Sequence, residues 1–169
     1  MISVEYCQLQ ARYNRWMNER LYAAARTLGD AQRKRDRGAF FGSIHRTLDH
    51  ILWGDCTWLG RFTGVPHGVP AYGADMHADF ETLARERDAA DTAILAWAGQ
   101  LAPARLAAPL EYRAASDGKP RRIPGWIAAA HLFQHAIHHR GQVTALMKQA
   151  GVDIGPTDLP YLPGVTRVL

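Results

Sequence analysis

The sequence predicts an all-α protein, an up-down four-helix bundle in which one long crossover joins the third and fourth helices. Three observations support this fold. Four segments of about twenty residues carry apolar side chains at steps of three and four, as helices with one buried face do. A longer stretch without that period separates the last two segments. The length, 169 residues, suits one domain over residues 1–169.

The first half of the chain supplies two of these helices. The first is expected at about residues 5–28, where Gly29 follows the last periodic position. A basic segment, residues 33–37, is interpreted as a solvated loop between helices. The second helix begins at Ser43, a favourable N-cap, and continues to about residue 62. Glycine and proline then make residues 64–73 irregular.

The second half supplies the other two helices. The third is expected at residues 79–101, before Pro103. Extended pieces flank the turn signal Ser116-Asp117-Gly118, which favours a small hairpin or an extended crossover. The fourth helix is expected at about residues 125–150. The proline-containing tail is expected to pack as irregular structure.

Composition excludes several classes of protein. With 47% hydrophobic and 21% charged residues, the chain is neither disordered nor fibrous. No apolar stretch is long enough to cross a membrane, and the N-terminus lacks the apolar core of a signal peptide, so a cytoplasmic protein is expected. The net charge of +4 comes partly from the short basic segment, which contains an acidic residue and no aromatic one, so no nucleic-acid partner is expected.

Histidine is the unusual feature of the sequence, because four of the eight histidines lie within HLFQHAIHH. His135 and His139 are four residues apart, project from one helix face and can chelate one ion. A third ligand must come from a neighbouring helix. His45 and His50 are candidates, but about 140° of helix rotation separates them. Gly54, one turn after His50, leaves room for an exogenous ligand and favours His50.

Other polar side chains near this pattern have less specific interpretations. His45 precedes Asp49 by four residues and is expected to pair with it on an exposed face. Gln142 lies on the histidine stripe and is a candidate for binding a group on the metal. Asp55 faces away from His50 and is interpreted as an interhelical partner, and Cys56 is a poor candidate for ligand or nucleophile. A histidine pair at this spacing is, taken alone, more often ordinary polar surface.

The chain resembles the DinB family of damage-inducible-type helical bundles. The segments that carry the resemblance are YNRWMNERLYAAARTL, SIHRTLDHILWGDCTWLGRF, HLFQHAIHHRGQVTALMKQAG and GVDIGPTDLPYL. The resemblance implies a bundle with one long crossover, commonly dimeric, that holds a divalent ion through three histidines. Aligned motif to motif, these are His50, His135 and His139. Imidazole ligands suit zinc, nickel, copper or iron, and zinc or nickel is expected here. His131 and His138 belong to the family pattern and are interpreted as supporting or structural residues.

Three histidines leave coordination positions open, as in catalytic metal sites. The wider superfamily includes mycothiol-dependent isomerases and bacillithiol transferases, so the resemblance permits a thiol S-transferase with a low-molecular-weight thiol as cosubstrate. A small metal-dependent hydrolase, a non-catalytic stress-associated metal-binding protein and a helical interaction module are the alternatives. No general base is evident in the sequence, and the substrate is not identified.

A homodimer is expected because the first two helices carry more large aromatic residues than one buried stripe accommodates. These residues are Tyr6, Tyr13, Trp16, Tyr22, Trp53, Trp58 and Phe62. The tryptophans at 16, 53 and 58 are interpreted as core or pocket wall.

Overall fold

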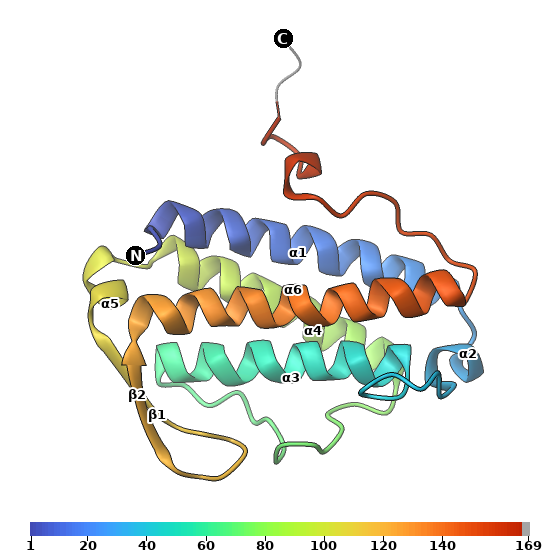
Figure 1. The fold of residues 1–169 in the computed structure, drawn as a ribbon, viewed down its shortest axis with the longest axis horizontal. Helices are drawn as coiled ribbons and strands as arrows, with labels where there is room; N and C mark the ends of the chain where they lie inside the picture. Colours follow the sequence, from blue (N-terminus) through green and yellow to red (C-terminus); the bar gives the residue numbers. More distant parts are fainter. Residues whose placement is uncertain (167–169) are drawn as a thin grey trace.

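Four long helices make up most of the computed structural model, which describes residues 1–166 (Figure 1). The long helices are α1 (Val4–Arg26), α3 (Ile44–Thr63), α4 (Phe80–Gly99) and α6 (Gly125–Gln149). The shorter elements are α2 (Asp30–Lys34), α5 (Pro103–Ala107), the antiparallel strands β1 (Pro109–Arg113) and β2 (Pro120–Pro124), and the 3-10 turn η1 (Leu159–Tyr161). The protein is therefore mostly helical with one small hairpin, and the long helices begin and end within two residues of the predicted limits.

Side-chain caps explain where three of the long helices begin. The hydroxyl of Ser3 accepts a hydrogen bond from the backbone N–H of Tyr6, and Ser43 and Asp79 cap α3 and α4 in the same way. At the other end of α3, Gly64 has a φ of 73°, the left-handed conformation that closes a helix and that glycine adopts without strain. The cap predicted at Ser43 is confirmed.

The directions of α3 and α4 correct the predicted topology. His45 near the start of α3 contacts Phe80 at the start of α4, with ring centroids 6.4 Å apart. Phe62 near the end of α3 contacts Trp97 near the end of α4, at 4.8 Å. The two helices therefore run in the same direction, and residues 64–79 cross the length of the molecule between them (Figure 1). The prediction that the crossover joins the third and fourth helices is wrong.

Chain length accounts for this arrangement. A helix of 20 residues is about 30 Å long, and the extended segment 64–79 can span more than that. The residues between α4 and α6 are instead taken up by α5 and the hairpin, which stay at one end of the helices (Figure 1). Periodicity reports the extent of a helix but not its direction. The sequence therefore did not show whether the long crossover lies between α3 and α4 or between α4 and α6.

Two polar side chains of α3 hold the crossover in place. The ring Nε2 of His45 donates to the carbonyl of His77 at 2.8 Å. The carboxylate of Asp49 accepts hydrogen bonds from the backbone N–H groups of Met76 and His77, at 2.7 and 2.9 Å. Both side chains are buried. The expected exposed pair of His45 with Asp49 is therefore wrong, because the crossover covers this face and needs partners for its backbone.

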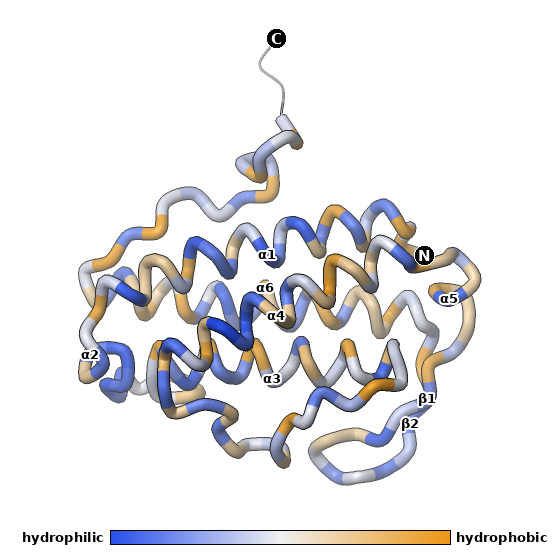
Figure 2. The backbone as a smooth tube through the Cα atoms, turned by 180° about the vertical axis from the view of Figure 1, so that it is seen from behind, coloured by the Kyte–Doolittle hydropathy of each residue, from blue (hydrophilic) through white to orange (hydrophobic). Residues whose placement is uncertain are grey.

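The interior combines apolar clusters with a buried polar layer. Two clusters draw on all four long helices, and Figure 2 shows polar and apolar residues mixed along each helix. In the polar layer, Arg87 of α4 pairs with Asp55 of α3 at 2.8 Å and with Asp91 at 2.9 Å, and all three are buried. The prediction of Asp55 as an interhelical partner is confirmed.

The remaining segments pack around the long helices. The hairpin pairs Leu110 with Ile123 in an antiparallel register, and its turn contains Gly118 with a φ of 68°, as the sequence indicated. The C-terminal segment runs back along α1 (Figure 1), where the guanidinium of Arg20 donates to the carbonyls of Ile154 and Pro156. Part of the predicted basic loop, residues 33 and 34, instead belongs to α2, because Asp30 bonds Lys34 one turn later.

Most of the aromatic residues that suggested a dimer pack in the interior of a single copy of the protein. Tyr13, Tyr22, Trp53 and Trp58 are buried within one copy of the protein. The homodimer remains a prediction, and its aromatic argument now depends on the other three residues of that set. Within residues 1–166, no helix combines the length and apolarity needed to cross a membrane.

Candidate metal centre

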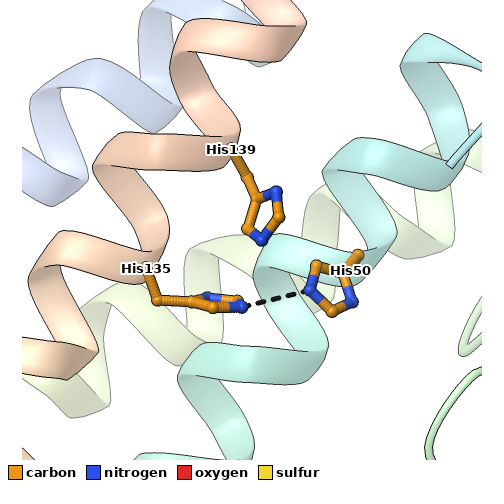
Figure 3. Close-up of side chains that lie close together, drawn as sticks. All are labelled: His50, His135 and His139. Atoms are coloured by element: carbon orange, nitrogen blue, oxygen red, sulfur yellow. Dashed lines mark hydrogen bonds between the residues drawn. The ribbon is translucent and has the colours of Figure 1, made fainter. Parts of the chain in front are cut away.

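Three histidine side chains from two antiparallel helices meet at one point. His135 and His139 project from neighbouring turns of α6, and His50 reaches toward them from α3 (Figure 3). One ring nitrogen of each lies within 4.8 Å of the other two. The two Nε2 atoms of His50 and His135 are 3.1 Å apart. The predicted grouping of these three side chains is confirmed, and such a group could hold a metal ion.

Glycine at position 54 makes room for one of these rings. A Cβ atom on Gly54 would lie 2.4 Å from Cε1 and 2.7 Å from Nδ1 of His135. Ordinary carbon contacts are about 3.5–4.0 Å, so any side chain here would displace the imidazole. The sequence predicted that an exogenous ligand would occupy this space. That expectation is wrong, because the antiparallel packing of α6 on α3 fills the space with His135 itself.

A hydrogen-bond chain along α6 orients the third ring. Nδ1 of His139 donates to the side-chain oxygen of Gln142 at 2.9 Å, and the amide nitrogen of Gln142 donates to Nε2 of His138 at 3.2 Å. With its proton held on Nδ1, His139 presents the lone pair of Nε2 toward the other two rings. Gln142 therefore positions a ring of the cluster, where the sequence had suggested that it would bind a group on the metal.

Burial keeps the cluster uncharged. Desolvation, with a smaller effect of His139, lowers the pKa of His50 to about 4. Desolvation, followed by smaller effects of the neighbouring histidines with His139 first, lowers the pKa of His135 to about 3. Desolvation also lowers the pKa of His139, partly offset by the hydrogen bond to Gln142. Neutral imidazole is the form that binds metal ions, so the three rings are in that form at neutral pH.

Aromatic rings form the wall beside the cluster. Phe41 stacks on His50 with ring centroids 3.9 Å apart, and Trp53 lies nearly parallel to His50 at 5.8 Å. The indole N–H of Trp53 donates to the carbonyl of Pro70 in the crossover at 3.0 Å, and Tyr72 packs against the indole. Phe41 and Tyr72 were missed by the sequence analysis, since both lie in loops whose path no periodicity reveals.

The three histidines line one part of a pocket of about 410 Å³. Its wall includes Trp58 and His131, whose rings are 4.9 Å apart, together with Tyr112 of β1. Trp53 and Trp58 thus serve as pocket wall, as predicted. Arg61 of α3 also lines the pocket, and no motif in the sequence pointed to this role.

Two other side chains from the sequence analysis are buried away from the pocket lining. Cys56 lies in the interior, and burial raises the pKa of its thiol to about 11. That thiol is therefore protonated at neutral pH, which agrees with its dismissal as a nucleophile. Asp55 lies in the buried ion pair with Arg87.

Comparison with known proteins agrees with this fold. The sequence profile of the DinB family matches residues 3–166. The chain belongs to the DinB family. It is similar to the protein DinB of Bacillus subtilis (strain 168), with 24% identity over 151 residues that cover 86% of this chain and 87% of the relative. A DinB-like protein from Bacillus cereus ATCC 10987, known from a crystal structure, superposes with a TM-score of 0.61 at 22% identity, covering 83% and 89% of the two chains.

Proposed function

We propose that this DinB-family chain holds one divalent transition ion, zinc or nickel, through His50, His135 and His139. The observation that carries the proposal is the 3.1 Å separation of the Nε2 atoms of His50 and His135. Two imidazole nitrogens about 2.0–2.1 Å from a shared ion lie about 2.9–3.4 Å apart at coordination angles near 90–109°. The side chains of His50 and His135 are thus already spaced for a common ion, and a nitrogen of His139 lies within 4.8 Å of both.

The surroundings of the cluster also suit such an ion. Burial keeps the rings neutral, and Gln142 fixes the tautomer of His139. Hydrogen bonds of this kind from a ligand's second nitrogen are the usual support of metal-bound histidines. Nδ1 of His135 is buried without a hydrogen-bond partner among the described residues, so Nε2 is the nitrogen of this ring that faces other polar atoms.

The pocket favours a metal-dependent enzyme over a storage or structural site. Structural metal sites are closed by four protein ligands, whereas three histidines next to a pocket of about 410 Å³ leave space for a second molecule. A bound divalent ion would act there as a Lewis acid and favour the thiolate form of a thiol. The aromatic rings of Phe41 and Trp53 shield one side of the cluster from water.

Within this class we propose a thiol S-transferase that uses a low-molecular-weight thiol as cosubstrate. A metal-dependent hydrolase and a stress-associated metal-binding protein without turnover are the competing functions. The protein has two free, buried cysteines, in keeping with a reducing compartment, so we propose a cytoplasmic location. A homodimer, expected from the partly exposed aromatic residues, completes the proposal.

Metal titration tests the site. Protein purified without a histidine tag is loaded with zinc or nickel, and bound metal is measured after dialysis. We expect one equivalent in the wild type and in His67→Ala, which alters an exposed histidine outside the cluster. His50→Ala is expected to retain much less. Equal metal content in wild type and His50→Ala would refute the site.

Turnover distinguishes the functions. The loaded protein is assayed with a panel of low-molecular-weight thiols and an electrophilic acceptor, and separately with ester and amide substrates. Thiol consumption that His50→Ala abolishes supports the transferase. Hydrolysis alone would assign the protein to the second class, and metal binding without either reaction to the third.

A further inference from the structure

Arg61 lies on the same side of α3 as His50, at the far part of the pocket. Eleven residues separate them, which is three helix turns and about 20°. The guanidinium carbon of Arg61 is 4.3 Å from the centre of the Trp58 ring and 4.4 Å from the centre of the Tyr112 ring. Nη2 donates to the carbonyl of Arg113 at 3.2 Å. These contacts hold the cation in the pocket wall.

Arg61 has no anionic partner within residues 1–166. No Asp or Glu oxygen of these residues lies within ion-pairing distance of its guanidinium, whereas the buried guanidinium of Arg87 pairs with two carboxylates, those of Asp55 and Asp91. Of its five N–H donors, one meets a protein carbonyl. A half-buried guanidinium held by two aromatic rings, with N–H donors to spare, has the geometry that binds carboxylates and phosphates.

The residues that line the pocket limit the class of anion that fits beside Arg61. Among the described residues that line it, Arg61 is the single permanent cation, and none is a carboxylate. One positive charge matches a monoanion, and the planar guanidinium matches a carboxylate with two parallel hydrogen bonds. A phosphate dianion would leave one charge unneutralised in this half-buried setting.

We propose that Arg61 binds the carboxylate of a substrate or cosubstrate whose other end reaches the three histidines. This inference rests on the proposed function, since it assigns the second end of the same ligand. Gly54, against which His135 packs, precedes Arg61 by seven residues, or about 10 Å along the helix. Ala114 and Ser116 line the pocket as well. The ligand class is therefore a flexible carboxylate with a thiol about six to eight bonds away.

Calorimetric and NMR titrations with matched probes test whether Arg61 binds a carboxylate. Zinc-loaded protein is titrated with 6-mercaptohexanoate and with 6-mercaptohexanol, which differ only in the terminal group. The metal-free protein is titrated by NMR with hexanoate and hexanol. We expect the carboxylate to bind about tenfold more tightly than the alcohol in both pairs, as one hydrogen-bonded charge pair provides.

Three variants test whether Arg61 causes the preference for the carboxylate over the alcohol. Arg61→Met keeps the stem against the rings and is expected to remove the preference, and Arg61→Gln, made in case the first variant does not fold, is expected to do the same. Arg105→Met is the matched control, because Arg105 is exposed and likewise donates to a single backbone carbonyl, that of Phe62. It is expected to keep the preference.

The outcomes separate this inference from the proposed function. Equal affinity for carboxylate and alcohol in the wild type, or a preference that survives in a folded Arg61 variant, overturns the assignment of Arg61. Tighter binding of hexyl phosphate than of hexanoate overturns the carboxylate class. If the protein binds hexanoate through Arg61 but takes up neither zinc nor nickel, the anion site stands and the metal centre alone is refuted.

Discussion

Replacing Gly54 with alanine places a methyl group 2.4 Å from Cε1 and 2.7 Å from Nδ1 of His135. Carbon atoms in contact are normally about 3.5–4.0 Å apart, so one of the two must move by about 1 Å or more. The methyl group is fixed to the backbone of α3. The imidazole turns about its side-chain bonds and is the group that yields, so the change is directed at His135.

Two effects of opposite sign determine the stability of this variant. Overpacking of an interior costs about 1–3 kcal/mol, whereas alanine in a helix interior gains about 1 kcal/mol over glycine. The free energy of unfolding without metal is therefore expected to fall by no more than about 2 kcal/mol. Metal affinity is expected to fall much further. Disturbing a group that merely orients a ligand already costs about 10–100-fold, and here a ligand ring itself is displaced.

Metal affinity and thermal unfolding are measured on the same preparations, with Gly141→Ala as the matched control. Gly141 also lies inside a long helix, but a Cβ there meets nothing within 4 Å. We expect this control to bind metal as the wild type does and to be slightly more stable. Metal affinity of Gly54→Ala within twofold of the wild type would refute the role assigned to the packing of His135 on Gly54.

Three further predictions follow from the site and its surroundings. Gln142→Leu removes the acceptor for Nδ1 of His139 and is expected to weaken metal binding about 10–100-fold in the same titration, with unchanged helix content by circular dichroism. In the presence of a chelator, the unfolded chain takes up protons on His50 and His135 below about pH 6.5, but the folded chain does so only near pH 4 and 3. The contribution of these two rings to the free energy of unfolding is therefore constant above pH 6.5 and falls by roughly 1–3 kcal/mol per pH unit below it, as urea titrations between pH 7 and pH 5 would show; a free energy that does not change over that range contradicts the burial argument. Sedimentation at micromolar concentration is expected to give a dimer, and a monomer at all concentrations would show that the partly exposed Tyr6, Trp16 and Phe62 form no interface.

Local chemistry made the helices predictable from the sequence. Apolar periodicity and the side chains of Ser43 and Asp79 act within a few residues, so both the start and the extent of α3 and α4 were readable along the chain. Helix rotation likewise placed His135 and His139 on one face and separated His45 from His50. The choice of His50 over His45 came from the resemblance to the DinB family and from Gly54, whose space proved to hold His135 instead of an exogenous ligand.

Tertiary structure alone decided how those helices meet. The parallel course of α3 and α4 depends on which connection spans the molecule, and neither 64–79 nor 100–124 carries a periodic signal of its path. The role of Gly54 depended on a ring 81 residues later in the chain, just as the stacking of Arg61 on Tyr112 depended on the position of the hairpin. Helical periodicity reports which face of a segment is buried. Which side chain of another segment occupies the space opposite is set by long-range packing, so it became visible only once the chain was folded.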